Sequence, residues 1–413
     1  MVALLAKALL AKVKLVMSKT AIVIGGGIAG CSTAYALAKR GIAITLIEQH
    51  EQLATEASGN PIATLYPKLS IKPSAQSTLA LQGFTYTLNL LKQLPNSADF
   101  FHACGQIQLA YDAREQARQN ALIAQQETAF FQAVDAQTAS EIAGIPLKIG
   151  GLFLPQAGWV KQQAFCKALV GMPNISVISH SKALDIQKID HQWQVKFDDK
   201  NLQAEIVVLC NANQVPQFSL CASAVSTPVR GQVNFFAPTL ASQPIKSIIC
   251  STHYLSPAVD GLHSIGATYA PDDMNPNLSQ ADTLENTYAL QKISPEIFNS
   301  IQPQQAQGRV AWRSHTQDYL PLAGQMLDES ALRAKPPRYY AKPADLSWLH
   351  GLYVNAGHGS KGLITAPICA ELIANLIENE PLVMNKNGAS KLNPSRFLLK
   401  ELGLKQLANS LIV

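Results

Sequence analysis

A glycine-rich stretch near the N-terminus, Gly25-Gly26-Gly27-Ile28-Ala29-Gly30, has the spacing of a loop that binds a dinucleotide. Gly25 would permit a tight turn, Gly27 would let the backbone approach a pyrophosphate, and Gly30 would let a helix pack close to a strand. Glu48, 18 residues after Gly30, stands where an acid accepts hydrogen bonds from a ribose 2′-hydroxyl. These residues predict a bound dinucleotide; the alternative is a tight turn with a surface glutamate.

A second glycine-rich loop, from Gly357 to Gly362, stands at the start of a helix pattern near the C-terminus. Such a loop can turn backbone N–H groups and the positive end of a helix dipole toward the pyrimidine end of a flavin, where reduction builds negative charge. The cofactor-binding residues predicted there are Gly357, Gly359, Ser360, Gly362 and Leu363. A nicotinamide enzyme has no evident need for this distant loop, so the two loops together favour FAD over NAD.

The segment Ser58-Gly59-Asn60, ten residues past Glu48, offers a hydroxyl group, bare backbone and an amide group. The pyrophosphate and the flavin edge of FAD would pass these groups. Ile28 and Ala29 begin the helix after the first loop, and their N–H groups would face the phosphates. We therefore include Ile28, Ala29, Ser58 and Asn60 in the predicted FAD site.

The elements that must position these loops form one nucleotide-binding unit at each end of the chain. Residues 21–24 are apolar and β-branched, as in a strand that is buried on both faces. A helix pattern follows and stops at Gly41, and a second strand is predicted over 43–48. Near the C-terminus, a strand over 351–355 precedes the second loop, and a helix is predicted over 363–379.

The middle of the chain has a different pattern. Helices are predicted over 79–94 and 113–143, with a short strand at 105–111 between them. Further strands are predicted over 191–197, 204–209, 232–236, 247–254 and 263–269. This order predicts an α/β fold in which a discontinuous, Rossmann-like FAD-binding domain carries an inserted substrate domain of antiparallel β-sheet and helices.

The predicted division of the chain follows from this order. We expect a basic tail at 1–19, an FAD-binding domain from 20–85, 141–225 and 309–400, a substrate domain from 86–140 and 226–308, and a C-terminal tail at 401–413.

Composition excludes several classes of protein. The seven cysteines include no C-x-x-C pair, which favours a reducing compartment, the cytoplasm, and argues against a metal site. Lysines interrupt the apolar run of residues 1–20, and three consecutive glycines near the start of the uncharged run 21–38 favour a buried strand and turn over a membrane helix. Of the net charge of +5, the lysines before Thr20 supply four, so a nucleic-acid surface must be a local patch.

The first loop, followed by Ala34, Leu37, Gly41, Glu48 and Ala57-Ser58, resembles the amine-oxidising flavoproteins. That family includes D-amino acid oxidase, glycine oxidase and sarcosine oxidase, and the resemblance implies their fold and FAD. Within the family, six phrases resemble the FAD module of bifunctional enzymes that finish 5-methylaminomethyl-2-thiouridine at the tRNA wobble position. They are ASGNPIATLYPKLS (57–70), PVRGQV (228–233), YLSP with HSIGATY (254–257, 263–269), GRVAWRSHTQDYLPLAG (308–324), GHGSKGLITAP (357–367) and LNPSRF (392–397).

This resemblance runs from about Ala21 to Phe397 and implies an oxidative reaction on tRNA. The 5-carboxymethylaminomethyl group of the (2-thio)uridine would be oxidised at its C–N bond, which releases glyoxylate and leaves 5-aminomethyl-(2-thio)uridine. The bifunctional enzymes also carry a methyltransferase module ahead of the FAD module. We expect methylation to require a separate methyltransferase polypeptide or a part of the protein outside this chain.

The resemblance also implies residues for the substrate. A carboxylate is bound better by Arg than by Lys, and Arg313 lies in the stretch that resembles the carboxylate-binding segment of glycine oxidase. Tyr254 resembles the active-site tyrosine of the same family, and His358 could tune the flavin or contact the substrate. The alternatives are a structural salt bridge for Arg313 and a core position for Tyr254. Arg230 is a second possible anion ligand, although a structural role is favoured.

The same comparison bears on how FAD is held. No cysteine falls within 308–324, near the point where sarcosine oxidase attaches its flavin, so we expect FAD to be bound non-covalently.

A basic and aromatic run at 333–342 is the predicted tRNA contact. Its cations are Arg333, Lys335, Arg338 and Lys342, and they flank two tyrosines that could stack on a splayed base. The alternative is a solvated, proline-rich loop. Lys68, Lys361 and Arg396 are expected to add positive charge near the mouth of the pocket.

Three functions remain open from the sequence. The leading hypothesis is the tRNA oxidase, which the LYP, LNPSR and PLAG phrases favour. The second is an oxidase of a small free amino acid such as glycine or sarcosine, which the near-neutral charge of the chain after the tail favours. The third is an inactive flavin-binding subunit that docks tRNA or a methyltransferase.

Overall fold

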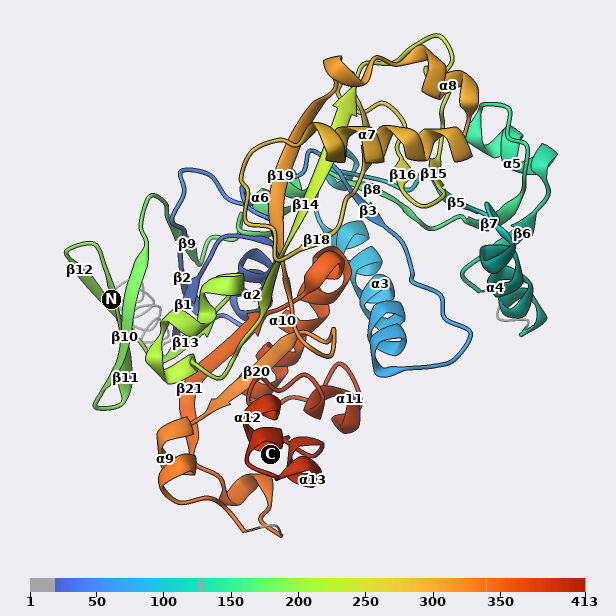
Figure 1. Ribbon diagram of the computed structural model, residues 1–413. Coiled ribbons are helices and arrows are strands. Elements are labelled where there is room, and N and C mark those ends of the chain that lie inside the picture. The colour runs from blue at the N-terminus through green and yellow to red at the C-terminus, as the bar shows by residue number, and fades with distance from the viewer. Residues whose placement is uncertain (1–18, 126–128, 339, 413) are drawn as a thin grey trace, which may run out of the picture.

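The structure is a computed structural model that describes residues 19–125, 129–338 and 340–412. The predicted basic tail therefore lies outside the described residues except for Lys19. Figure 1 shows two regions joined by long strands: a parallel sheet with helices, and a second sheet whose outer side carries further helices.

The parallel sheet holds both predicted nucleotide-binding units. Among the described residues it has six strands in the order β20-β21-β13-β1-β2-β9, and only the β20–β21 pair is antiparallel. The strands are β1 (Thr20–Ile24), β2 (Ala43–Ile47), β9 (Ile175–Ile178), β13 (Ile206–Leu209), β20 (Leu322–Leu327) and β21 (Trp348–Ala356). β1 from the N-terminal unit and β21 from the C-terminal unit both pair with β13, so the two ends of the chain share one sheet, as predicted.

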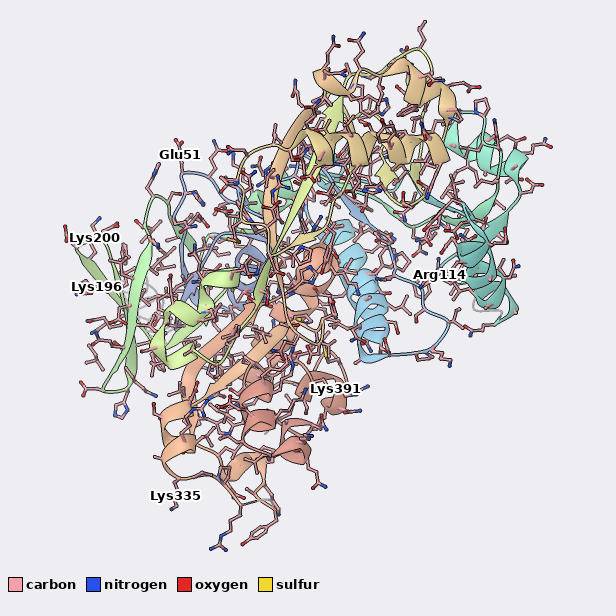
Figure 2. The ribbon with its side chains drawn as sticks, in the orientation of Figure 1. Glu51, Arg114, Lys196, Lys200, Lys335 and Lys391 are labelled. Carbon is pink, nitrogen blue, oxygen red and sulfur yellow. The ribbon has the colours of Figure 1, made fainter. Side chains whose placement is uncertain are left out.

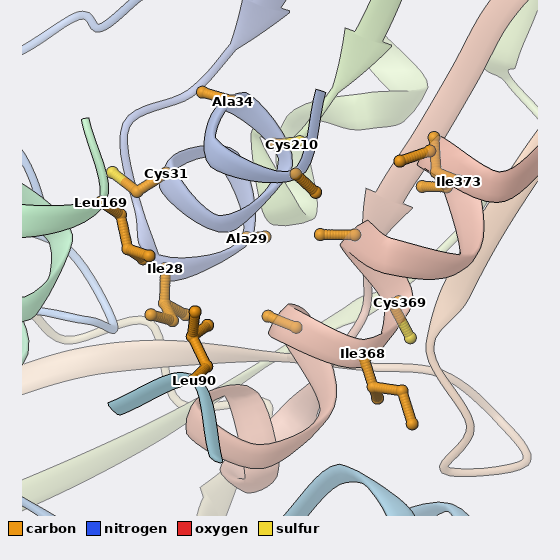
Figure 3. Close-up of a cluster of buried hydrophobic side chains, with 14 of the residues drawn as sticks. Ile28, Ala29, Cys31, Ala34, Leu90, Leu169, Cys210, Ile368, Cys369 and Ile373 are labelled. Atoms are coloured by element: carbon orange, nitrogen blue, oxygen red, sulfur yellow. The ribbon is translucent and has the colours of Figure 1, made fainter. Parts of the chain in front are cut away.

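Four helices pack around the buried part of this sheet. They are α2 (Ile28–Ala38), α3 (Ala75–Gln93), α6 (Gln162–Leu169) and α10 (Gly362–Glu378). Figure 3 shows Ile28 and Cys31 of α2 near Leu169 of α6, and Ile368 of α10 belongs to the same apolar cluster on its other side. A Cβ on Gly83 of α3 would lie 2.2 Å from the Ile364 carbonyl oxygen, so a glycine is needed where these helices meet.

The helix over Gly359–Glu378 is long and apolar enough to cross a membrane by length and composition. Its most apolar window is 72% buried inside the protein, which is the situation of a core helix in a folded domain.

The larger sheet forms the second region. Its path is β18-β14-β17-β16-β15-β5-β7-β6, and β19 pairs along β14. The strands are β5 (Gln106–Leu109), β6 (Gln132–Val134), β7 (Gly151–Leu154), β14 (Thr227–Phe236), β15 (Ile248–Cys250), β16 (Tyr254–Leu255), β17 (His263–Gly266), β18 (Ala270–Pro271) and β19 (Gln307–His315).

The two faces of this sheet have different neighbours. Ile107, Ile249 and Leu255 belong to an apolar cluster with helical residues of the second region, such as Leu290. Helices α5 (Ala136–Ala143), α7 (Gln280–Tyr288) and α8 (Pro295–Ser300) lie on this outer side (Figure 1). Side chains alternate between the faces of a strand, so Gln106 and Gln108 point to the opposite face, toward the parallel sheet.

The remaining strands of the described residues form two three-stranded sheets. One joins β3 (Ala63–Leu65), β8 (Gly158–Val160) and β4 (Phe101–His102), and the other is the meander β10 (Ala183–Ile189), β11 (Gln192–Phe197) and β12 (Lys200–Ala204).

Several predicted boundaries were wrong. The helix predicted over 113–143 is two helices, α4 (Ala113–Ala124) and α5, separated by β6, because Asp112 and Asp135 each begin a helix by accepting a backbone N–H bond from Glu115 and Thr138. The strand predicted over 247–254 is the hairpin β15–β16. Ala204, predicted to begin a buried strand, ends β12 instead.

The C-terminal part differs from the expected simple ending. α10 is followed by α11 (Lys386–Ser390), α12 (Arg396–Glu401) and α13 (Lys405–Ala408). Leu407 and Leu411, in the predicted C-terminal tail, are buried in an apolar cluster with Leu398 and with Leu332 of α9 (Glu329–Ala334).

Strand pairing crosses the predicted domain limits. β7 lies in a range predicted for the FAD-binding domain, yet it pairs with β5 and β6 of the larger sheet. β19 pairs with β14 along its whole length, although most of it falls in the range 309–400. The division into domains therefore stays a prediction.

Candidate functional site

A cavity of about 1090 Å³ lies between the carboxyl ends of the parallel strands and the inner face of the larger sheet. This edge is where open α/β sheets bind ligands, and the volume suits a large cofactor together with a substrate. Fifteen predicted site residues line it: Gly25, Gly27, Ile28, Ala29, Glu48, Ser58, Asn60, Tyr254, Arg313, Gly357, His358, Gly359, Ser360, Gly362 and Leu363. Segments from both ends of the chain therefore meet at one site.

The first glycine loop turns tightly between β1 and α2. Gly25 has φ of +102°, and a Cβ on Gly30 would lie 1.8 Å from the carbonyl oxygen of Gly25. Gly30 does not line the cavity; it lets the helix close over the turn. A Cβ on Gly27 would meet only the Ser58 hydroxyl, at 3.4 Å, so Gly27 leaves bare backbone facing the cavity.

Glu48 is held at the end of β2 by two backbone groups. Its Oε2 accepts a hydrogen bond of 2.6 Å from the N–H of Gly26, and its Oε1 accepts one of 2.8 Å from the N–H of His50. A carboxylate has about four acceptor sites, so two remain for a ligand in the cavity. These free acceptor sites fit a ribose, whose hydroxyl groups donate hydrogen bonds to a fixed acceptor.

Ser58 and Asn60 are also fixed by contacts. Ser58 Oγ accepts a hydrogen bond of 3.1 Å from the N–H of Ile28, the first residue of α2, and keeps its own hydroxyl proton for another acceptor. Asn60 Oδ1 accepts one of 3.0 Å from Arg309 Nη1, and among the described residues the amide N–H groups of Asn60 have no acceptor. Both residues thus present hydrogen-bond donors.

Arg309 was not predicted from the sequence. It lies on β19, and besides Asn60 it donates to the backbone carbonyls of Thr55 and Glu56. Its guanidinium therefore ties the segment 55–60 to the larger sheet. The sequence does not mark this role of Arg309, because its main partners are backbone carbonyl groups about 250 residues away, and every residue type has such a group.

The second glycine loop follows β21 and leads into α10. Gly357 and Gly359 have φ of +72° and +57°, and a Cβ on Gly359 would lie 2.7 Å from the ring of His315. The loop is therefore close against β19, and the first N–H groups of α10 lie at the cavity.

The residues present fit FAD. Asn211, which follows β13 and lines the cavity, has both side-chain polar atoms buried without a partner among the described residues, and so does His358 at Nε2. Buried polar groups of this kind ordinarily have a partner. Together with the bare backbone at Gly27 and the free acceptor sites of Glu48, they match a long polar ligand. Asn211 was also missed by the sequence prediction.

Arg313 stands on the inner face of β19. Its Nη1 donates a hydrogen bond of 3.1 Å to the carbonyl of Thr268, and its guanidinium occupies the space beside Gly231, where a Cβ would lie 2.4 Å from it. Burial lowers the pKa of Arg313, and the nearby Tyr254 and Tyr269 offset only part of that decrease. Within the described chain, no Asp or Glu forms an ion pair with it. A cation so placed favours an anionic ligand.

Tyr254 and His358 stand near this cation. The hydroxyl of Tyr254 lies 3.0 Å from Ser264 Oγ, and burial raises the pKa of Tyr254, so the phenol stays protonated. His358 Nδ1 lies 3.0 Å from Thr365 Oγ1, and burial lowers the pKa of His358 to about 3. His358 is therefore neutral at physiological pH.

Arg230 and Arg396 lie elsewhere. Arg230 is buried and donates to Asp282 and to the carbonyls of Asn275 and Asn277. Arg396 was expected near the pocket mouth, and that expectation was wrong. It is buried, and its guanidinium donates to both oxygens of Asp318 at 2.9 and 2.7 Å. This arrangement holds the chain after α11 to the turn after β19.

The basic run at 333–342 does not line the cavity. Arg333 pairs with Glu329 and Glu401, so its charge is already compensated, while Tyr339 lies outside the described residues. Figure 2 places Lys335 at the end of the molecule that carries α9. The predicted tRNA contacts there, Arg333, Lys335, Arg338 and Lys342, stay predictions.

Side chains that commonly bind metal ions are not clustered in the part of the chain that is described. In that part, no three His, Cys, Asp or Glu side chains are grouped so that they could hold a metal ion.

Comparison with known proteins assigns residues 20–376 to the family described as DAO, FAD dependent oxidoreductase. Among curated proteins, the chain is 41% identical over 394 residues to the "tRNA 5-methylaminomethyl-2-thiouridine biosynthesis bifunctional protein MnmC" of Methylobacillus flagellatus. It is 40% identical over 397 residues to the protein of the same name from Pseudomonas syringae pv. syringae. These matches cover 95% and 93% of this chain but 61% and 59% of the relatives, so the chain spans about three fifths of their length.

Solved structures share the fold. Glycine oxidase from Geobacillus kaustophilus is similar with a TM-score of 0.73 and 20% identity, over 92% of this chain and 99% of that one. L-proline dehydrogenase from P. horikoshii is similar with a TM-score of 0.71 and 18% identity, over 93% and 98% of the two chains. At these identities the likeness concerns the fold alone, and it confirms the α/β fold of the D-amino acid oxidase type that the sequence predicted.

Proposed function

This chain belongs to the family of FAD-dependent oxidoreductases, and from that premise we propose that it oxidises a secondary amine that carries a carboxylate. The observation that carries the proposal is Arg313. Its guanidinium lines the cavity and has no carboxylate partner among the described residues, while Tyr254 stands in the same part of the cavity. A substrate carboxylate would supply the missing counter-charge, in the two-pronged geometry that arginine favours.

The residues that would hold FAD come from both glycine loops. Glu48 and the bare backbone around Gly27 offer contacts for the ribose and the pyrophosphate, and the segment 357–363 offers N–H groups at the start of α10. The bound FAD would supply the two-electron acceptor that no side chain provides. We propose that it is held without a covalent bond, since the stretch 308–324 contains no cysteine.

The protein's part in the reaction is binding and orientation. Arg313 would fix the carboxylate, so that the CH₂ group between carboxylate and nitrogen has one defined position in the cavity. Loss of a hydride equivalent from that carbon and of the amine proton gives an imine. Water then splits its C=N bond into glyoxylate and a primary amine. His358 is neutral, so it would contribute hydrogen bonding at Nε2 rather than charge.

The proposed substrate is 5-carboxymethylaminomethyl-(2-thio)uridine at the wobble position of tRNA, and the product is the 5-aminomethyl nucleoside. The support is the identity of about 40% to MnmC proteins across almost the whole chain. The likeness to glycine oxidase, at 20% identity, concerns the fold alone. A tRNA substrate would place the enzyme in the cytoplasm. We also propose that methylation of the product depends on a methyltransferase, either a separate polypeptide or a segment outside this chain.

The test uses the FAD-loaded protein under anaerobic conditions. Three substrates are supplied separately: tRNA that carries the carboxymethylaminomethyl group, glycine and sarcosine. Bleaching of the flavin absorption by the tRNA, with glyoxylate released, supports the proposal. Bleaching by glycine or sarcosine alone would replace it with the free amino acid oxidase, and bleaching by none of them would leave a flavin-binding subunit.

A further inference from the structure

An aromatic and cationic group of side chains lies beside Arg313 and is not explained by cofactor binding. His315 follows Arg313 by two residues on β19, so both point to the same face of that strand. The ring of His315 stands edge-on to Tyr269, with centroids 5.6 Å apart and an interplanar angle of 88°, and to Tyr319, at 5.8 Å and 81°. We call Tyr269, His315 and Tyr319 the aromatic rim.

The rim is exposed where a core cluster would be buried. Tyr269 is 52% exposed and Tyr319 is 62% exposed, although both are large aromatic residues. Tyr269 also lines the cavity, so the rim continues the substrate site outward to the surface. Exposed aromatic rings that are grouped at the mouth of a site are typical of a surface that binds a ligand or a partner.

Two lysines add positive charge to this position. Lys361 belongs to the turn 359–361, whose Gly359 is packed against the ring of His315, and Lys68 lines the cavity. The positive charges repel one another. Burial and then Lys68 lower the pKa of Lys361, and burial, Arg313 and Lys361 lower the pKa of His315. Among the described residues, neither lysine has a carboxylate partner. The nearby Asp318 is already paired with Arg396.

We propose that the aromatic rim, with Lys68 and Lys361, is the surface that binds the single-stranded RNA loop on either side of the target nucleoside. Exposed aromatic rings accept stacked bases of any sequence, and unpaired cations beside them accept the phosphates of an unstacked backbone. A fully paired duplex lacks free base faces and would not use the rings. The near-neutral charge of the chain outside its first 19 residues requires such a local site, since a general electrostatic attraction is weak.

The inference rests on the proposed tRNA substrate and names a surface that the sequence did not predict. Lys68 and Lys361 were expected to add charge near the pocket mouth, but Tyr269, His315 and Tyr319 are brought together only by the fold. The rim is formed by the end of β19, the segment before β18 and the turn after β19. It is distinct from the run at 333–342, which does not line the cavity.

The experiment measures binding of an anticodon stem-loop RNA that carries the carboxymethylaminomethyl uridine to the FAD-loaded protein. One variant combines Tyr269→Ala with Tyr319→Ala, and a second combines Lys68→Gln with Lys361→Gln. Tyr319→Trp tests whether another ring restores binding. Matched controls are Tyr288→Ala, which removes a tyrosine that is 54% exposed elsewhere, and Lys196→Gln with Lys200→Gln, exposed lysines on β11 and β12 (Figure 2). Flavin absorption verifies that each variant is folded and loaded.

We expect the tyrosine pair to raise the Kd for the stem-loop about tenfold or more, since base stacking on one ring contributes this much. The lysine pair should raise Kd and reduce the slope of log Kd against log salt concentration by about 1.4, which corresponds to two lost phosphate contacts on a single strand. In both variants, kcat/KM for tRNA should fall relative to kcat/KM for the free modified nucleoside. Tyr319→Trp should bind as the wild type does, and both controls should too.

An unchanged Kd in either paired variant, an equal loss in the controls, or equal affinity for a fully paired duplex overturns the rim as the RNA site. If the wild type oxidises the modified tRNA while these variants bind it normally, only the rim is wrong. If the wild type neither binds nor oxidises that tRNA, the proposed function fails and the rim proposal fails with it.

Discussion

His358 Nδ1 lies 3.0 Å from Oγ1 of Thr365, and the hydroxyl of Thr365 donates in turn to the carbonyl of Lys361 at 2.9 Å. Because the single proton of that hydroxyl is committed to the carbonyl, Oγ1 can only accept from the ring. Nδ1 therefore carries the proton of the neutral imidazole, and the buried Nε2 carries a lone pair. The structure thus fixes both the charge and the tautomer of the histidine in the second glycine loop.

Replacing this histidine should reduce the pH dependence of stability. The pKa of His358 is about 3 in the folded chain against an ordinary value of 6.5, so the unfolded chain binds the extra proton as the pH falls below 6.5. Stability is then lost between about pH 6.5 and pH 3. His358→Gln should remove about 2 kcal/mol of the loss in unfolding free energy between pH 7 and pH 5. Urea unfolding at both pH values, with saturating FAD, measures the difference.

The control for that experiment is His191→Gln, which removes a side chain that is exposed in the folded chain. It should leave the pH dependence as in the wild type. If His358→Gln also behaved like the wild type, the ring would be solvated in the folded protein.

The first glycine loop separates two effects of a methyl group. In Gly30→Ala the new Cβ would lie 1.8 Å from the Gly25 carbonyl oxygen, so we expect loss of both stability and FAD binding. In Gly27→Ala the Cβ would meet only Ser58 Oγ at 3.4 Å, so the fold should tolerate it while the methyl group obstructs the cofactor. Thermal unfolding of the FAD-free protein and FAD titration measure the two properties. A Gly27→Ala variant with normal FAD affinity would contradict the assignment of this backbone to the pyrophosphate.

The cofactor half of the site was predictable because its signals are local. The glycine spacing, the β-branched strand before it and Glu48 lie within 30 residues, and each has a direct physical reason. Both glycines were assigned roles from spacing alone. The carbonyl oxygen 1.8 Å from a Cβ on Gly30 agrees with close packing of the helix on the turn, whereas Gly27 leaves bare backbone at the cavity and its contact with a pyrophosphate stays a prediction. The choice of FAD over NAD followed from the second loop. That loop is far from the first loop in the sequence, and the two meet at one cavity only in the folded chain.

The rest depended on contacts between distant segments. Arg309 reaches carbonyl groups about 250 residues away, and Tyr269 and Tyr319 meet on the ring of His315, so no spacing in the sequence marks them. Arg396 was expected to add charge at the pocket mouth, yet it is buried and its guanidinium binds Asp318 inside the protein. The helix predicted over 113–143 was too long, because the prediction relied on the Gln- and Ala-rich composition and overlooked Asp135, which begins a new helix.

Removing Arg309 should loosen the segment that faces the cofactor. Its guanidinium connects β19 to the Thr55 and Glu56 carbonyls and to Asn60, and these groups lose their partner in Arg309→Ala. We expect about 2 kcal/mol lower unfolding free energy and FAD affinity weakened about tenfold. Arg309→Lys should recover only part of the stability, because one ammonium group cannot make all the contacts of the guanidinium group. Identical FAD affinity in wild type and Arg309→Ala would show that the tie has no bearing on the cofactor.

Arg313→Ala should impair the use of carboxylate substrates in particular. Among the described residues, the guanidinium is a cavity cation without a carboxylate partner, and loss of its charge-assisted hydrogen bonds to a substrate carboxylate costs about 3 kcal/mol, or roughly a hundredfold in kcat/KM. Arg313→Lys should recover little, because a lysine cannot make the paired contact. The matched control is Arg118→Ala, since Arg118 also lines the cavity but is already paired with Glu115 at 2.6 Å. Anaerobic flavin reduction by modified tRNA and by an analogue that lacks the carboxylate measures the preference. The wild type should prefer the carboxylate substrate and Arg313→Ala should not, whereas an Arg313→Ala variant that kept the preference would place the carboxylate at another cation.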